Sequence, residues 1–390
     1  MSKDLEQFVA NWNYPTAVRA GCGRVDDLAA ACRELNIKNP LLVTDPGLRD
    51  LPMVQSAAQQ CREQLEGCAV FAEIKSNPNE QNIEQGVLAC KAGSHDGVIA
   101  LGGGSALDAG KAIALMVGQN RPIWDFEDVG DNYLRVNVSA MLPVIALPTT
   151  SGTGSEVGRA SVITDSQKKL KKIIFHPAML PGLVILDPEL TSGLPAKLTA
   201  ATGMDALSHN LEALCSPLYH PMARGIAMEG IKLIKENLPA AVADGNNLHA
   251  RTQMQVASCM GATAFQKGLG AMHALAHPLG ALFDAHHGML NAVLMPYVLK
   301  ANESVIASDM EDLARYLNLP HASFQSILDW VIELRAQLGI PNSLAEIGID
   351  DSLIEQIGQM AFEDPSAGTN PIAFTAAEYS DICLRAIHGS

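Results

Sequence analysis

The pattern of apolar and polar positions divides the chain into two halves. Up to about residue 190, short apolar runs alternate with stretches of helical periodicity. The apolar runs are PLLVTD (40–45), AVFAEI (69–74), DGVIAL (96–101), PVIALP (143–148) and LVILD (183–187). Buried apolar strands that alternate with helices are typical of a parallel sheet covered on both faces. We therefore predict an α/β N-terminal domain with a Rossmann-like parallel sheet.

The second half has a different pattern. After LDPELTSGLP (186–195) the strand-like runs stop, and the sequence becomes rich in Ala, Leu and Met with helical periodicity. This change predicts an all-α C-terminal domain. We place the boundary near Ser192, which gives domains 1–192 and 193–390.

Composition and charge narrow the class of protein. The 390 residues are 48% hydrophobic, and the formal net charge of −15 argues against nucleic acid or an anionic membrane as partner. No run of 18 apolar residues suggests a transmembrane helix, and the start MSKDLEQFVANWNYP lacks the apolar core of a signal peptide. We expect a cytoplasmic protein. None of the eight cysteines forms a C-x-x-C pair, which argues against a thiolate zinc site.

A glycine-rich segment follows one predicted strand directly. DGVIAL runs into GGGSALDAGKAIAL, where glycines allow a tight turn and close approach of a ligand. We expect Ser105 to cap the following helix, with Asp108 three residues later as in a capping box. Free amides and the helix dipole at such a terminus suit a phosphate. The motif departs from G-x-G-x-x-G at Leu107, and Asp45, at the end of an earlier strand, is the candidate acid for the ribose.

A second loop of this kind, TTSGTGSE (149–156), follows the run PVIALP. Hydroxyls and glycines offer hydrogen bonds without bulk. Two such loops at the same ends of parallel strands indicate one crevice that holds a cofactor. The alternative for each loop is a turn without a ligand.

Histidines cluster in the helical half. Residues 268–288 hold His273, His277, His286 and His287, although the whole chain has only 11 histidines. His273 and His277 are four apart and share one face of a helix, which we expect Pro278 and Gly280 to disturb. A buried histidine needs a partner for each ring nitrogen, and a metal ion or a substrate can supply one. The alternative is a core histidine with surface histidines at a turn.

Another helical segment supplies further ligands. LTAATGMDALSHNLEAL (198–214) carries Asp205 and His209 four apart, and also Glu212. One carboxylate and three imidazoles suit a divalent first-row metal such as iron or zinc. Zinc binds more tightly than iron(II) on the Irving–Williams order, so availability decides between them.

Taken together, these motifs resemble the iron-containing, group III alcohol dehydrogenases over essentially the whole chain. The resemblance depends on GGGSALDAGKA, LPTTSGTGSE, LDPELTSGLPAKLTAATGMDALSHNLEA, and GAMHALAHPLGA with HHGMLNAVLMPYV. It implies the dehydroquinate synthase-like architecture, with a dinucleotide-binding N-terminal domain and a metal-binding helical domain. The implied metal ligands are Asp205, His209, His273 and His287. His277 matches a further histidine near the metal, and His286 lies where the family varies.

The resemblance also implies the cofactor, NAD, and its contacts. These would fall on Asp45, Asn77, Gly102, Gly103, Gly104, Ser105, Asp108, Thr149, Thr150, Thr153 and Lys171. Lys172, next to Lys171, makes that last match uncertain by one position. Similar proteins form homodimers or larger homo-oligomers.

The implied reaction passes a hydride between a primary alcohol and NAD, and reduces the aldehyde in reverse. The metal polarises the substrate oxygen as a Lewis acid. His277 either passes the proton to solvent or supports the metal site. Asp45 would bind the ribose 2′-OH and repel a 2′-phosphate, which predicts NAD over NADP, unless it only caps the turn at Pro46 and Gly47.

The substrate and some alternatives stay open. Arg159 and Lys267 lie near the motifs and could pair with a carboxylate, which would suit an ω-hydroxy acid, or they could reach solvent or the cofactor phosphates. The competing hypotheses are a polyol dehydrogenase or a dehydroquinate synthase-like lyase of the same architecture, and a nucleotide-binding sensor without catalysis.

Overall fold

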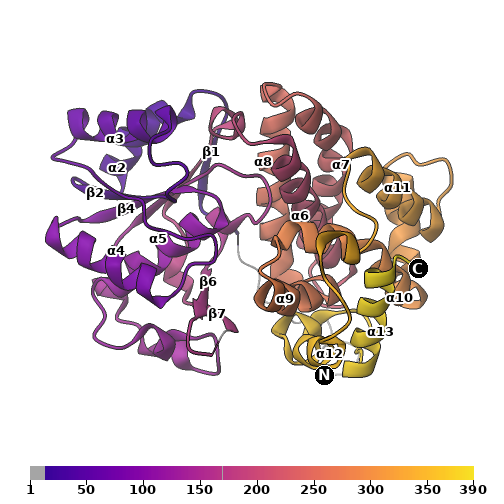
Figure 1. Ribbon diagram of the computed structural model, residues 1–390. Helices are drawn as coiled ribbons and strands as arrows, with labels where there is room; N and C mark the ends of the chain where they lie inside the picture. The colour runs from indigo at the N-terminus through magenta and orange to yellow at the C-terminus, as the bar shows by residue number, and fades with distance from the viewer. Residues whose placement is uncertain (1–13, 169) are drawn as a thin grey trace, which may run out of the picture. The chain divides into compact units, whose positions relative to one another are not determined.

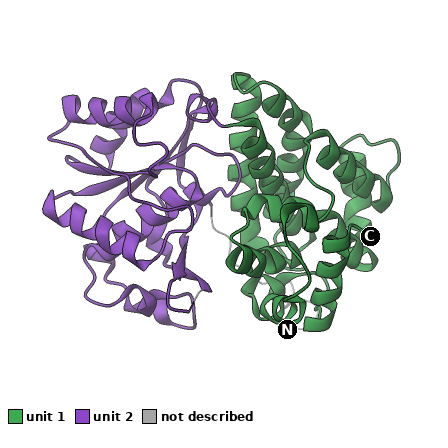
Figure 2. Cartoon of the chain, in the orientation of Figure 1, with its two compact units in different colours: residues 1–13, 195–390 green, residues 14–194 purple. Residues whose placement is uncertain are grey.

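The computed structural model describes residues 14–168 and 170–390, which form two compact units (Figure 2). One unit comprises residues 14–194, and the other contains residues 195–390. The division falls two residues after the boundary predicted at Ser192. The predicted N-terminal domain also included residues 1–13, which lie outside the described residues.

The first unit is built on a parallel sheet, as predicted. Its strands are β1 (Ala17–Ala20), β2 (Pro40–Val43), β3 (Ala69–Phe71), β4 (Gly97–Gly102), β5 (Val144–Pro148) and β8 (Leu183–Leu186). Their order is β1-β8-β5-β4-β2-β3, and every neighbouring pair is parallel. Its helices are α2 (Leu28–Glu34), α3 (Pro52–Gln64), α4 (Glu80–Ala92) and α5 (Gly104–Met116). All five strands predicted from apolar runs are confirmed.

Helices cover both faces of this sheet, which explains why its strands are continuous apolar runs. Figure 1 shows α2 and α3 on one side of the sheet and α4 and α5 on the other. Because side chains alternate along a strand, Ile99 and Leu101 of β4 pack with α2 and α3. Ala100 faces the other side, where a Cβ on Gly110 of α5 would lie 2.6 Å from the Ala100 Cβ. A glycine there lets the helix lie close against the strand.

The strand order creates a switch point between β2 and β4. From β2 the chain continues to β3 on one side, and then crosses to β4 on the other side of β2. In open parallel sheets, ligands bind outside the carboxyl ends of the strands at such a reversal. The fold therefore points to the ends of β2 and β4, where Asp45 and Gly102 lie.

Three strands of this unit were not predicted from the sequence, the edge strand β1 and the two strands of a hairpin. The edge strand β1 has four residues and is mostly exposed, so it shows no apolar run. The antiparallel hairpin of β6 (Ala160–Asp165) and β7 (Leu170–Phe175) forms a separate sheet. Its strands mix polar and apolar residues because only part of each is buried.

The described residues of the second unit form helices joined by loops and contain no strand, which confirms the predicted all-α domain. Its helices are α6 (Ala196–Cys215), α7 (Pro221–Ala243), α8 (Leu248–Ala264), α9 (Ala271–Phe283), α10 (His287–Tyr316), α11 (Phe324–Gln337), α12 (Ile354–Glu363) and α13 (Ala376–His388). Helix α6 is buried along almost its whole length from Thr199 to Leu214. Apolar and small residues occur all round this helix, as expected for a helix that is buried on all sides, and the site residues Asp205, His209 and Glu212 lie among them.

Pro278 and Gly280, which we expected to disturb this helix, do not end it. Helix α9 continues through both residues to Phe283 and ends at Asp284, which has a positive φ of 50°. A proline inside a helix costs about 3 kcal/mol through its missing N–H and its clash with the preceding turn. The buried packing of this apolar helix outweighs that cost, and α10 then begins at His287.

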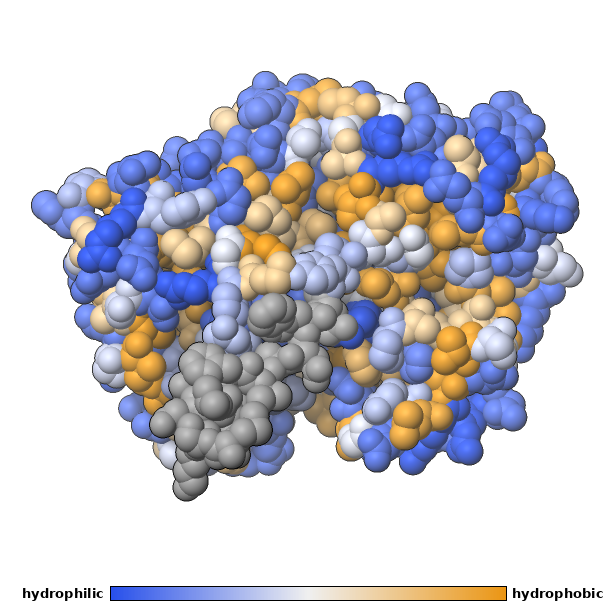
Figure 3. Space-filling view, turned by 180° about the vertical axis from the view of Figure 1, so that it is seen from behind, coloured by the Kyte–Doolittle hydropathy of each residue, from blue (hydrophilic) through white to orange (hydrophobic). Residues whose placement is uncertain are grey.

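No helix of the described chain has the length and apolar character needed to span a bilayer. On the face drawn in Figure 3, hydrophilic residues predominate and hydrophobic ones are interspersed among them.

Candidate metal centre and nucleotide site

Three helices of the second unit bring potential metal ligands together. Asp205 lies on α6, His273 on α9 and His287 at the first position of α10. One ligand atom from each residue lies within 4.8 Å of the other two. A Cβ on Gly288 would lie 2.5 Å from the carbonyl oxygen of Ala201, so this glycine lets α10 begin close against α6.

The acceptors of these three residues converge on one amide. Asn291 Nδ2 donates to Asp205 Oδ1 at 2.8 Å, and lies 3.3 Å from His273 Nε2 and 3.2 Å from His287 Nε2. Asn291 is fully buried, and its Oδ1 has no hydrogen-bond partner in the described structure. A carboxylate and two imidazole lone pairs facing one point form a donor set that fits a divalent cation.

The fourth predicted ligand, His209, lies next to this group. Its ring stacks on that of His273, with centroids 4.6 Å apart and an interplanar angle of 24°. Among the described residues, the set whose ligand atoms all lie within 4.8 Å contains Asp205, His273 and His287 but omits His209. The structure thus gathers three of the four predicted ligands and places the fourth ring in contact with them.

The charges at this centre suit metal binding. Burial opposes ionisation of Asp205, but His209, His287 and His273 together lower its pKa to about 2. Burial, with the charge of His209, holds the pKa of His273 well below its usual value. An ionised carboxylate and a neutral imidazole are the forms that bind a metal, because protons compete for the same lone pairs.

Glu212, which the sequence placed on the same helix without a role, contacts His273 directly. Its Oε2 lies 2.6 Å from His273 Nδ1, and its Oε1 accepts from the Met272 amide at 2.7 Å. Burial raises the pKa of Glu212 to about 7, against the effect of the Met272 and Gly270 amides. A nearby cation would favour the ionised form of this carboxyl group.

His277, the predicted catalytic residue, lies beside the metal centre with a carboxylate partner that sequence reasoning missed. Its Nδ1 is 2.8 Å from Asp364 Oδ2, and its ring stacks on His287 with centroids 5.5 Å apart. Burial disfavours the Asp364 carboxylate, but the hydrogen bond and charge of His277 hold its pKa below its usual value. Asp364 follows α12, 87 positions from His277, and no spacing rule connects them.

His286 has a structural role that agrees with its exclusion from the predicted ligands. It is the N-cap of α10, and its Nδ1 accepts from the Met289 amide at 3.4 Å.

In the first unit, three loops meet at the carboxyl edge of the sheet. The Thr149 amide, after β5, donates to the Gly102 carbonyl at the end of β4, at 3.0 Å. A Cβ on Gly102 would lie 3.6 Å from Asp45 Oδ2, after β2, and 2.6 Å from the Ala106 Cβ. Gly102 has a φ of +156°, which favours glycine. A Cβ on Gly104 would lie 2.8 Å from Thr153 Cγ2, so the two glycine-containing loops are in contact.

The predicted capping of α5 is wrong. Gly103 is the N-cap, and no side chain caps this terminus in the described structure. Ser105 falls inside the first turn because the helix begins at Gly104, two residues earlier than predicted, and its hydroxyl donates to the Ser76 carbonyl. Asp108 accepts instead from the Ser155 hydroxyl and from the Val162 amide at 2.9 Å, so it fixes the second loop and the hairpin.

The loop that contains Asn77 is tied to the hairpin that contains Lys171. The Thr164 amide of β6 donates to the Pro78 carbonyl at 2.8 Å, and Thr164 is the register partner of Lys171 on β7. Lys172, on the opposite face of β7, binds Glu127 at 2.8 Å. The ammonium of Lys172 is thus held by a carboxylate of its own unit, and the cofactor contact of Lys171 stays a prediction.

Asp45 caps the turn that follows β2, as the alternative to a ribose contact predicted. Its Oδ1 accepts from the Leu48 amide at 3.2 Å. Its Oδ2 is the oxygen that faces Gly102. Capping of the turn therefore engages one oxygen of the carboxylate.

The suggestion that Lys267 binds a substrate carboxylate is wrong. The residue is 6% exposed, and its Nζ donates to the carbonyls of Ala213, Leu214 and Ser216 at 3.0, 2.9 and 2.5 Å. All three protons of the ammonium are used at the C-terminal end of α6, where a cation also suits the helix dipole. Arg159 remains a candidate, and its guanidinium lies 5.7 Å from the ring centroid of Phe175.

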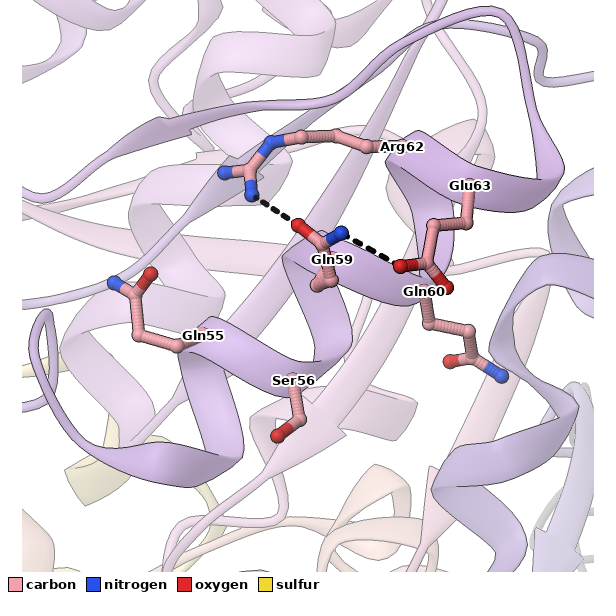
Figure 4. A pocket seen from close by; sticks show the side chains of 6 residues that line it. All are labelled: Gln55, Ser56, Gln59, Gln60, Arg62 and Glu63. Carbon is pink, nitrogen blue, oxygen red and sulfur yellow. Dashed lines mark hydrogen bonds between the residues drawn. The ribbon is translucent and has the colours of Figure 1, made fainter.

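A surface hollow along α3 contains none of the predicted site residues (Figure 4). It is lined by Gln55, Ser56, Gln59, Gln60, Arg62 and Glu63. Arg62 donates to Gln59 at 3.3 Å, and Gln59 donates to Glu63 at 2.6 Å. Three of the six side chains thus bond to one another along one helix, and we assign the hollow no ligand.

Comparison with known proteins gives the same family along both units. Residues 15–188 match the family described as iron-containing alcohol dehydrogenase, and residues 199–387 match the C-terminal family of Fe-containing alcohol dehydrogenases. The 4-hydroxybutyrate dehydrogenase of Cupriavidus necator is 38% identical over 94% of this chain and 97% of its own length. The 1,3-propanediol dehydrogenase of Citrobacter freundii is 34% identical over 98% of both chains.

Solved structures agree with this assignment. A 1,3-propanediol oxidoreductase superposes with a TM-score of 0.93 at 33% identity, covering 97% of this chain and all of the other. The sulfoacetaldehyde reductase of Bifidobacterium kashiwanohense, solved in complex with NAD⁺, has a TM-score of 0.88 at 27% identity, covering 97% of this chain and 99% of its own. The chain therefore belongs to the iron-containing alcohol dehydrogenase family of oxidoreductases.

Proposed function

We propose that this protein is a metal-dependent, NAD-linked dehydrogenase that interconverts a primary alcohol, a diol or a hydroxy acid with its aldehyde. The observation that carries the proposal is that ligand atoms of Asp205, His273 and His287, from three helices, lie within 4.8 Å of one another. We assign these residues as ligands of iron(II), with zinc as the alternative, and His209 as the fourth ligand because its ring lies against that of His273.

A divalent metal held by these residues would supply Lewis acidity to the substrate oxygen, and bound NAD would supply the hydride acceptor. The protein itself must remove the alcohol proton. When His277 Nδ1 donates to Asp364, its Nε2 carries a lone pair that accepts this proton. The side chain of His277 is 26% exposed, so the proton can continue to solvent. We therefore assign His277 as the catalytic proton carrier.

For the nucleotide we propose the residues that meet at the carboxyl edge of the parallel sheet. The set is Asp45, Asn77, Gly102, Gly103, Gly104, Ser105, Asp108, Thr149, Thr150, Thr153 and Lys171. Support comes from the contacts between their loops and from the switch point between β2 and β4. The structural relative in complex with NAD⁺ supports the choice of cofactor. Assembly as a homodimer or larger homo-oligomer, and a cytoplasmic location, stay predictions.

A substrate panel tests the reaction. We expect the iron(II)- or zinc-loaded protein to form NADH and aldehyde in equal amounts from primary alcohols, 1,3-propanediol or 4-hydroxybutyrate, read by absorbance and product analysis. Heat-denatured protein and metal-stripped protein are the controls. A lyase of the same architecture would show no net NADH, and a protein that binds NAD without turnover on any substrate would be a sensor instead.

The panel also decides the substrate class. A hydroxy acid is the second candidate, because the 4-hydroxybutyrate dehydrogenase of Cupriavidus necator is 38% identical to this chain. With Lys267 excluded, Arg159 is the remaining cation suggested for the carboxylate. A higher kcat/KM for 4-hydroxybutyrate than for 1-butanol would support the acid, and the reverse would favour neutral alcohols.

Replacing Asp45 by Asn is expected to relax the preference for NAD over NADP. The amide oxygen can still accept from Leu48, so the turn is kept, but the negative charge that repels a 2′-phosphate is lost. A charged hydrogen bond contributes about 1.5–3 kcal/mol, so the ratio of kcat/KM for NAD to that for NADP should fall about 10- to 100-fold. The matched control is Asp50→Asn, an exposed acid of the same turn. An unchanged ratio in the Asp45 variant would leave this residue with a capping role alone.

A further inference from the structure

We propose that Glu212 is a positioning residue that sets the tautomer of His273, so that His273 presents its Nε2 lone pair to the metal. The inference rests on the proposed function, because it takes His273 as a ligand. The sequence pattern did not assign this role, because Glu212 and His273 are 61 positions apart and lie on different helices.

The two oxygens of Glu212 bind two consecutive residues at the start of α9. Oε2 lies 2.6 Å from His273 Nδ1, and Oε1 accepts from the backbone amide of Met272 at 2.7 Å. Glu212 is 5% exposed and His273 is 1% exposed. Water therefore does not compete strongly for either group.

The chemistry of the pair determines which ring nitrogen carries the proton. A neutral imidazole has one N–H donor and one lone-pair acceptor, and an ionised carboxylate can only accept. When Glu212 is ionised, the ring proton therefore lies on Nδ1, which faces Glu212, and the lone pair lies on Nε2. On that other side of the ring, Nε2 lies 3.3 Å from Asn291 Nδ2, which is a donor, so both neighbours favour the same tautomer. A carboxylate on the outer nitrogen of a metal-binding histidine also increases its basicity.

The same contact holds the start of α9 in place. The Ala271 amide donates to Asn370 Oδ1 at 3.0 Å, next to the Met272 amide that Glu212 binds. A Cβ on Gly270 would lie 2.8 Å from Asn370 Oδ1 and 3.1 Å from Glu212 Oε1. Two side chains from other parts of the unit thus satisfy the first amides of α9, and a glycine leaves the space for them. Glu212 fixes both the position and the tautomer of His273.

The variant Glu212→Gln tests the tautomer, because it keeps the size of the side chain. If the new amide oxygen stays on Met272, its NH₂ group faces His273 Nδ1, and the ring proton must move to Nε2. If the amide turns the other way, its NH₂ group faces the N–H of Met272. We expect the affinity for zinc, measured by competition with a chromogenic chelator on metal-stripped protein, to fall about 10- to 100-fold.

Two comparisons separate this role from a general structural one. Asp364→Asn makes the same chemical change next to His277, which is not a proposed ligand, and should leave the zinc affinity unchanged. In a His273→Ala background, Glu212→Gln should cause no further loss of affinity. A further loss there, or unchanged affinity in the single Glu212 variant, would overturn the proposal.

The wild-type protein gives a test that needs no Glu212 variant. Selective ¹⁵N-histidine labelling of the full-length, metal-free chain reports the tautomer at alkaline pH, where Glu212 is ionised. The His273 signals are identified by their loss in His273→Ala. We expect the proton on Nδ1, and a proton on Nε2 would overturn the inference even if Glu212→Gln fails to fold. Failure of the proposed function gives a different result from failure of this inference. In that case the wild-type protein would bind no metal, whichever tautomer His273 adopts.

Discussion

Replacing His273 by Ala is expected to remove both the bound metal and the alcohol dehydrogenase activity. His273 is one of the three residues whose ligand atoms lie within 4.8 Å of one another, and it is 1% exposed. Loss of the Lewis acid removes several kcal/mol of transition-state stabilisation, and each 1.36 kcal/mol is tenfold in rate. We therefore expect kcat/KM to fall by at least about a thousandfold, with metal content measured by elemental analysis of the same samples.

The fold should survive this substitution, because the helical unit has a large apolar core on α6, α7, α10 and α11 that does not include the site. Circular dichroism and thermal melting check that point. His321→Ala, at an exposed histidine, is the matched control and should keep both metal and turnover. A His273 variant with full metal content and full rate would exclude this residue from the ligand set.

Replacing His277 by Ala is expected to lower kcat about 10²- to 10⁴-fold, the usual contribution of a positioned acid–base group. Metal content should stay at the wild-type level, because the Nδ1 of His277 is bound to Asp364 and the residue is not a proposed ligand. Added imidazole should restore part of the rate by accepting the proton in place of the missing ring. Steady-state kinetics with and without imidazole, and elemental analysis, give these values.

The two roles considered for His277 differ in whether the metal content falls together with kcat. Loss of metal together with activity would favour the other role that we considered, in which His277 supports the metal site. His286→Asn is the matched control, because Asn can still accept from the Met289 amide at the start of α10. This control should keep its turnover and metal.

The sequence alone was sufficient to predict the strands of the fold wherever burial on both faces requires a continuous apolar run. Strands β2, β4, β5 and β8 are buried on both faces, so each had to be a continuous apolar run, and each was predicted. The edge strand β1 and the hairpin β6–β7 are only partly buried, so their apolar pattern is weak and they were missed. The start of α5 was placed wrongly because Ser105 binds the Ser76 carbonyl, and only the packed fold brings that carbonyl near.

For the site, helical spacing determined which side chains share a face, and the tertiary structure decided their partners. The four-residue spacing of His273 and His277 could be read from the chain, because a helix has a fixed period. Their partners Glu212 and Asp364 could not, since they lie 61 and 87 positions away and meet the histidines only through helix packing. Lys267 is another residue whose partner the sequence did not reveal. Its closeness to His273 along the chain suggested a contact with a substrate carboxylate, but its buried ammonium donates to the carbonyl groups at the end of α6. Local periodicity depends on neighbours along the chain, whereas a hydrogen-bond partner depends on which surfaces the core brings together.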